Sequence, residues 1–241
     1  NSCGYEACTT SQRNITGNGI PNHAVGQFPN DGDPNAMTIQ NVSFIATLTP
    51  SKNSSPTYLG VGHPPGYMNN GIKLDPGTAE TVESNGQRWN VEALGQNVFD
   101  FGIDSNNGHV QPGGNYHQHG EPVNYIAAIN GQTSITLLGF AVDGFPIYSN
   151  LGYSNPNSSS SSIINIRSSW QLKTTPDPGR PSTTTYPMGT FTQDYEYIAG
   201  SGDLDECNGR FSVTPQFPSG IYQYYITESF PYIQRCIYGS D

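Results

Sequence analysis

Hydrophobic and polar residues alternate with a period of two along several short segments of the chain. Residues 42–48 place Val, Phe, Ala and Leu at every second position, with the polar residues Ser43 and Thr47 among those between them, which is typical of a strand with one buried face. Residues 135–142 are apolar on both faces and lead into the turn signal Asp143-Gly144, so we expect a central strand there. Residues 221–227 are β-branched and aromatic and predict a further strand.

Other segments support the same architecture. Ile164, Ile166, Trp170 and Leu172 are spaced to share one face of extended chain. The best helical candidate, residues 78–94, contains Ser-Asn-Gly in its middle, so we expect at most one short helix there. The pattern predicts a mostly β fold, a single domain of antiparallel strands, sandwich or barrel-like, with long Gly/Pro/Asn-rich loops and little helix.

Composition narrows the class of protein. The 241 residues include 28 Gly and 19 Pro, without a collagen-like period, so turns are dense. The net charge of −10 argues against nucleic acid and anionic lipid as partners and favours cations. We expect no membrane span, because no apolar run approaches the ~18 residues that one requires.

Several features are typical of a secreted protein. The chain begins Asn-Ser-Cys, without an initiator Met or an apolar leader, so we expect a processed, extracellular form. Four Asn-x-Ser/Thr sequons predict a glycoprotein. They lie at Asn14, Asn41, Asn53 and Asn157.

The four cysteines predict two disulfides, for which three pairings exist. We favour Cys3–Cys8, closing a short terminal loop, and Cys207–Cys236. We therefore expect a disulfide-bearing N-terminal segment at residues 1–16 and a β domain at residues 17–241. Free thiols in a reducing compartment are the alternative.

Histidines form the best candidate site. His117 and His119 are two residues apart, so on an extended backbone their imidazoles lie on one face. His109 lies eight residues upstream of His117, across a Pro-Gly-Gly segment able to reverse the chain. Three imidazoles with an open fourth position suit Zn²⁺ or Cu²⁺. Asp143 or Glu121 would complete the set or orient a ring.

Two other interpretations of these histidines stay open: a hydrogen-bonded polar core, and a metal-free acid/base site. Acidic loops are a separate cation candidate. Residues 31–35 read DGDPN, like the start of an EF-hand, but Ala36 and Val42 occupy the positions that require Gly and Glu. Weak Ca²⁺ binding there stays open, and a second acidic set comprises Asp194, Asp203, Asp205 and Glu206.

Catalytic signatures are scarce. GxSxG, HExxH and the phosphate-binding Walker loop are missing from the sequence. We therefore lean against an enzyme, without deciding the question. Tyr222, Tyr224 and Tyr225 suggest either core aromatics or a platform for sugar or assembly contacts.

The histidine segment resembles a known family. Residues 108–112 read GHVQP, residues 116–120 read YHQHG and residues 138–148 read LGFAVDGFPIY, and all three resemble motifs of the YHYH domain family. Further similar segments occur at residues 22–23 (NH), 28–30 (FPN), 70–71 (NG), 75–80 (DPGTAE), 194–197 (DYEY), 204–210 (LDECNGR) and 230–232 (FPY). The resemblance runs from about residue 17 to residue 239. Gln118 replaces the second tyrosine of the family motif.

The resemblance implies a secreted or surface-attached protein without implying an activity. Our first hypothesis is an extracellular domain that binds a metal through His109, His117 and His119, with Asp143 in support. The second is a structural subunit of a filament, matrix or cell surface, with self-assembly, matrix or glycan partners. The third is a metal-dependent hydrolase or oxidase.

Overall fold

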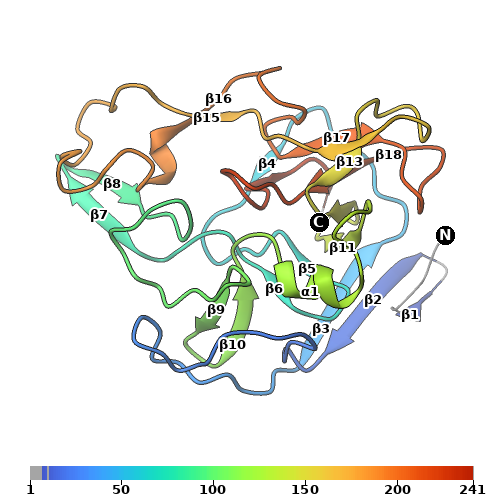
Figure 1. Ribbon diagram of the computed structural model, residues 1–241, viewed down its shortest axis with the longest axis horizontal. Helices are drawn as coiled ribbons and strands as arrows, with labels where there is room; N and C mark the ends of the chain where they lie inside the picture. Colours follow the sequence, from blue (N-terminus) through green and yellow to red (C-terminus); the bar gives the residue numbers. More distant parts are fainter. Residues whose placement is uncertain (1–6, 10, 241) are drawn as a thin grey trace.

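The protein is built around one open sheet of eight short strands (Figure 1). We describe residues 7–9 and 11–240 from a computed structural model. In spatial order the sheet contains β17 (Gly209–Ser212), β18 (Ile221–Tyr225), β12 (Pro146–Tyr148), β11 (Leu137–Ala141), β5 (Gly66–Met68), β6 (Lys73–Leu74), β10 (Asn115–Gln118) and β9 (Gly108–Gln111). Only β10–β6 and β12–β18 pair in parallel within it. The prediction of a mostly β, antiparallel, single-domain fold is confirmed, and the sheet does not close into a barrel.

The two-sided apolar segment at residues 135–142 supplies the interior strand β11, as predicted. Leu138 packs in the main core cluster, whereas Phe140 belongs to a second cluster that includes Phe44. Gly139 lies so close to β5 that a Cβ there would come within 2.1 Å of the Tyr67 carbonyl oxygen. Burial on both faces thus follows from an apolar strand between neighbours that approach closely.

A three-stranded sheet lies beside the larger one and contains β1 (Ala7–Cys8), β2 (Gln12–Gly17) and β3 (Val42–Thr47). Phe44 and Ala46 of β3 are buried while Ile45 is exposed, so the alternation predicted for residues 42–48 is confirmed. The expected division between residues 16 and 17 falls inside β2, whose six residues all pair with β3.

The remaining strands form separate pairs. They are β13 (Leu151–Tyr153) with β14 (Ile163–Asn165), β15 (Trp170–Leu172) with β16 (Tyr195–Tyr197), β4 (Thr57–Tyr58) with β19 (Cys236–Ile237), and β7 (Thr81–Ser84) with β8 (Gln87–Asn90). Among the described residues, two short helices complete the fold, α1 (Val123–Ala128) and the 3-10 turn η1 (Thr192–Asp194).

The segment considered for one short helix, residues 78–94, forms no helix. It contains the β7–β8 hairpin instead, because Asn85 and Gly86 both adopt positive φ and reverse the chain. The predicted common face of residues 164–172 was wrong, since β14 and β15 pair with different strands and Leu172 is exposed.

The disulfide Cys207–Cys236 is confirmed, and both cysteines are fully buried. It joins β19 to the loop that precedes β17. The predicted Cys3–Cys8 pair stays a prediction, because Cys3 lies outside the described residues. No helix among the described residues is long and apolar enough to span a membrane.

Three of the four sequons are at the surface. Asn41, Asn53 and Asn157 are exposed, whereas Asn14 is half-buried on β2. Glycosylation at these asparagines stays a prediction.

Replacing Cys207 and Cys236 together by Ala should lower the free energy of unfolding by roughly 3–4 kcal/mol, because the unfolded chain loses a cross-link that closes a loop of about 30 residues. Guanidinium denaturation of the variant and the wild type measures the difference. A loss below about 1 kcal/mol would contradict this role for the disulfide.

Candidate metal centre

The three histidines meet on the hairpin at one edge of the eight-stranded sheet. β9 and β10 pair antiparallel, and their register places His109 directly opposite His117. His119 is the first residue after β10 and lies on the same face as His117. The connecting turn contains Gly113 and Gly114, both with positive φ, which a residue with a side chain rarely adopts.

The imidazoles are close enough to share one ion. Their ring centroids are 4.7, 4.9 and 4.7 Å apart, and one nitrogen from each ring lies within 4.8 Å of the others. His109 Nε2 and His119 Nε2 face each other at 3.1 Å. Tetrahedral zinc with Zn–N bonds of about 2.0–2.1 Å would hold neighbouring nitrogens about 3.3 Å apart. The cluster therefore fits a transition metal with small side-chain adjustments.

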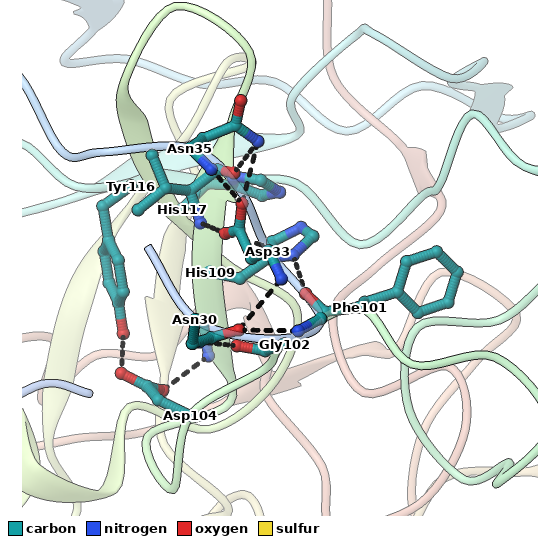
Figure 2. A network of polar contacts seen from close by, with 12 residues as sticks. Asn30, Asp33, Asn35, Phe101, Gly102, Asp104, His109, Tyr116 and His117 are labelled. Carbon is teal, nitrogen blue, oxygen red and sulfur yellow. Dashed lines mark hydrogen bonds and ion pairs between the residues drawn. The ribbon is translucent and has the colours of Figure 1, made fainter. Parts of the chain in front are cut away.

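A backbone carbonyl and a carboxylate orient His109 from its Nδ1 side, away from the other imidazoles (Figure 2). Its Nδ1 lies 2.6 Å from the Phe101 carbonyl oxygen, and Asp33 Oδ2 lies 4.0 Å from the same Nδ1. When Nδ1–H donates to this carbonyl, the lone pair of Nε2 points toward the other imidazoles. Outer contacts of this kind fix the tautomer that a metal requires.

Asp33 also caps the open edge of the sheet. Its Oδ2 accepts a hydrogen bond from Val110 N at 2.8 Å, and its Oδ1 accepts from the backbone and side-chain amides of Asn35. Asn35 Nδ2 in turn donates to the Val110 carbonyl. Side chains of the 33–35 loop thus replace the neighbouring strand that β9 lacks and hold His109 in place.

Burial keeps two of the imidazoles neutral. The pKa of His117 is lowered to about 3, mainly by burial, with smaller contributions from charge on His109 and Lys73. Burial also lowers the pKa of His119 well below its usual value, and charge on His117 and His109 adds to the effect. Both rings therefore offer unprotonated nitrogens at neutral pH.

One side of the cluster opens into a cavity of about 460 Å³. All three histidines contribute to its wall, together with Asp33, Asp75 and Glu80. Lys73 and Asp75 form an ion pair of 2.8 Å there, which compensates the lysine charge. A fourth coordination position would face this acidic cavity rather than packed protein.

The carboxylates expected beside the histidines lie elsewhere. Asp143 occupies the turn after β11, where its Oδ2 accepts hydrogen bonds from Tyr224 Oη at 2.6 Å and Gly239 N at 2.9 Å. Glu121 lines a separate, smaller cavity. Asp143 is therefore corrected from a metal-supporting residue to one that holds the C-terminal segment against β18, and Asp33 is the carboxylate next to the imidazoles.

Among the described residues, the histidines form the only group of three or more His, Cys, Asp or Glu side chains close enough to hold a metal ion. The DGDPN loop does not form a second one, since Asp33 already accepts amide hydrogen bonds at both oxygens. The sequence suggested this loop as a weak Ca²⁺ site, whereas the structure places its Asp33 beside His109 of the candidate transition-metal site. The DGDPN spacing alone carried no signal that Asp33 would face His109, because the two are 76 positions apart.

The face of β10 opposite the imidazoles is a buried polar network. Tyr116 Oη donates to Asp104 Oδ2 at 3.0 Å (Figure 2). Gln118, with its amide oriented to satisfy its neighbours, donates to the Asn106 carbonyl at 2.7 Å. The side chain that replaces the family tyrosine thus faces away from the histidines, as the strand period predicts.

The three tyrosines of β18 are core residues, not a surface platform. Tyr222 is 5% exposed, and Tyr224 and Tyr225 are fully buried.

In metal-free protein, the two lowered pKa values predict a loss of stability at acid pH. Below about pH 6.5 the unfolded chain protonates His117 and His119 while the folded chain does not, so the free energy of unfolding should fall as the pH drops from 6.5 toward 4. The slope reaches about 1.4 kcal/mol per pH unit for each imidazole. Urea titrations at several pH values measure it.

A variant with His117→Gln and His119→Gln lacks both titrating groups and should show a shallower slope over the same interval. Equal slopes in the two proteins would show that the rings protonate in the folded state.

Comparison with known proteins identifies the family. A model of the family described as YHYH protein matches residues 43–239, which is most of the chain. No curated protein and no solved structure matches significantly. The matched region contains β9, β10 and all three histidines of the cluster. This chain belongs to the YHYH protein family.

Proposed function

We propose that this protein binds a divalent transition metal, Zn²⁺ or Cu²⁺, through His109, His117 and His119. The observation that carries the proposal is the convergence of three imidazoles whose nitrogens lie within 4.8 Å of one another. Neutral imidazole nitrogens are suitable ligands for both ions. The low pKa values of His117 and His119 mean that protons compete weakly for these nitrogens at neutral pH.

Electrostatics supports a cation at this position. Asp33 lies beside His109, and Asp75 and Glu80 line the same cavity. The whole chain carries a net charge of −10, so its long-range potential also attracts cations. A bound ion would also replace the direct contact between His109 Nε2 and His119 Nε2, which lie 3.1 Å apart.

A catalytic role is the second candidate, and the cavity is the observation that favours it. A closed structural metal site has four protein ligands, whereas a site with three ligands and a solvent-facing position is typical of catalytic metals. When bound, zinc or copper would supply Lewis-acid or redox chemistry. The chain's own contribution would be to orient the ligands through Phe101 and Asp33 and to place carboxylates around the cavity.

We further propose that the protein works outside the cell. The buried disulfide Cys207–Cys236 supports this, because structural disulfides persist mainly in oxidising compartments. The exposed sequons are compatible with glycosylation there. Self-assembly and binding to an extracellular matrix or glycan stay predictions.

Metal binding is tested by titrating metal-free protein with Zn²⁺ and Cu²⁺ in a calorimeter. We expect about one equivalent of at least one ion to bind in the wild type and binding to be lost in the variant His117→Ala/His119→Ala. The metal should raise the melting temperature of the wild type, and a chelator should reverse the rise.

His63→Ala is a matched control, because His63 is an exposed histidine outside the cluster and the variant should keep the metal. Asp33→Asn should weaken binding by about 10–100-fold, as expected for the loss of an outer carboxylate. Less than about a tenth of an equivalent of either ion in the wild type would reject the proposal.

A further inference from the structure

The eight-stranded sheet consists of two halves with the same strand arrangement. In the first half, the hairpins β5–β6 and β9–β10 lie side by side, and β6 pairs in parallel with β10. In the second half, the hairpins β11–β12 and β17–β18 lie side by side, and β12 pairs in parallel with β18. The hairpins β9–β10 and β17–β18 therefore occupy equivalent places at the two ends of the sheet (Figure 1).

The two halves meet through reciprocal contacts. β5 and β11 pair antiparallel at the centre of the sheet. Gly66 lies opposite Ala141 and Gly139 lies opposite Met68, so each glycine faces the residue two positions after the other glycine. Reciprocal contacts of this kind relate two equivalent units by a two-fold axis.

The first hairpin of each half has the same turn. Gly71 N donates to the Met68 carbonyl and Gly144 N donates to the Ala141 carbonyl, both at 2.9 Å. The two glycines have positive φ angles of 81° and 87°. Positions 66–74 of the first half are therefore equivalent to positions 139–147 of the second.

The loops that lead into the second hairpins match in more detail. In both loops an aspartate makes two hydrogen bonds with the glycine four positions later and accepts a third from a tyrosine on the second strand of the hairpin. These residues are Asp104, Gly108 and Tyr116 in the first half and Asp205, Gly209 and Tyr222 in the second. Asn107 and Asn208, just before the glycines, both have a φ of 58°. Residues with a side chain seldom adopt such a φ, so the agreement indicates that the loops are two copies of one structure.

This equivalence assigns a counterpart to each histidine of the cluster. The counterparts of His109, His117 and His119 are Arg210, Gln223 and Tyr225, in that order. Arg210 and Gln223 lie directly opposite each other, as the first two histidines do. The backbone N–H of Tyr225 donates to the positive-φ asparagine of its loop at 2.9 Å, as that of His119 does at 2.8 Å.

The three counterparts also converge. Gln223 Nε2 donates to Tyr225 Oη at 2.5 Å, and the guanidinium carbon of Arg210 lies 5.3 Å from the centroid of the Tyr225 ring. Gln223 and Tyr225 are fully buried, and β13 covers the cluster, since Arg210 Nη2 donates to the Tyr153 carbonyl at 2.6 Å. Arginine stays protonated in proteins. This cluster therefore holds a fixed positive charge, whereas the histidine cluster borders an open cavity.

We propose that the sheet is an internal duplication and that Arg210, Gln223 and Tyr225 are the second copy of the histidine site. In this copy the guanidinium supplies the positive charge that a bound metal ion supplies in the first. The second copy is thus a structural cluster that needs no ion. The inference rests on the proposed function only for the ion in the first copy, because the equivalence of the two sites follows from strand pairing and loop structure.

Exchanging the side chains of the two sites tests the proposal. Arg210→His/Gln223→His places two imidazoles opposite each other on β17–β18. After refolding with Zn²⁺ or Cu²⁺ and gel filtration, elemental analysis should find about one equivalent more of at least one ion than in the wild type. The matched control is Arg210→His/Phe211→His, because neighbours on a strand face opposite sides and Phe211 is exposed. The control should gain no ion.

The reciprocal variant, His109→Arg/His117→Gln/His119→Tyr, gives the first site the side chains of the second. The cavity of about 460 Å³ beside the histidines leaves room for the larger side chains. Without metal, this variant should melt at or above the temperature of the metal-free wild type and should not respond to a chelator, because the guanidinium replaces the ion. His117→Ala/His119→Ala adds no charge and should melt at least about 4 °C lower than the reciprocal variant.

The outcomes distinguish this proposal from the proposed function. An ion in Arg210→His/Gln223→His but none in the wild type would reject the metal site of the wild type and keep the duplication. A folded Arg210→His/Gln223→His variant without an additional ion, or the same gain in its control, would overturn the duplication of the site. So would a reciprocal variant that melts below His117→Ala/His119→Ala, and this comparison decides the question if Arg210→His/Gln223→His does not fold.

Discussion

Four residue pairs hold β9 against β10, and the register of these pairs decides what the site can do. His109 lies opposite His117 because the turn between them has the length and the two positive-φ glycines that this register requires. A slip by one residue would turn His109 to the opposite face. The hairpin lies at the sheet edge, where Val110 N donates to Asp33 Oδ2 and the Val110 carbonyl accepts from Asn35 Nδ2, and these two hydrogen bonds secure its outer side.

The same hairpin separates two kinds of polar chemistry. On one face, Tyr116 and Gln118 enter a network in which donors and acceptors are largely satisfied inside the protein. On the other face, His117 and His119 are buried with nitrogens that the protein leaves available, and their pKa values are lowered accordingly. A satisfied network stabilises the fold, whereas buried polar groups without full satisfaction are costly, and at His117 and His119 a bound metal ion would offset that cost.

The metal cavity and the cavity that adjoins it are lined by different kinds of side chain. The metal cavity is lined by imidazoles and carboxylates, whereas an adjoining cavity of about 320 Å³ has the aromatic residues Tyr58 and Trp170 in its lining. They share the contact between Val61 and Gly77, so each cavity is built partly from the same two segments.

The sequence alone determined the strands with strong local patterns. The two-sided apolar segment at residues 135–142 and the alternation at residues 42–48 specify burial directly, and the i, i+2 spacing of His117 and His119 places them on one face. The motifs around these histidines also identified the family. The β7–β8 hairpin was missed because a segment of mixed propensity forms a helix or a hairpin according to its turn, and here Asn85 and Gly86 reverse the chain.

Tertiary structure decided which distant residues meet. Asp33 lies beside His109, and Gln234 lines a cavity with Trp170, across separations that no local pattern encodes. Asp143 was expected at the histidines, yet its hydrogen bonds to Tyr224 and Gly239 place it at the C-terminal segment. Local periodicity reports which side of a strand faces the core, whereas the partner of a buried polar group depends on how loops pack, and that packing is set by the whole chain.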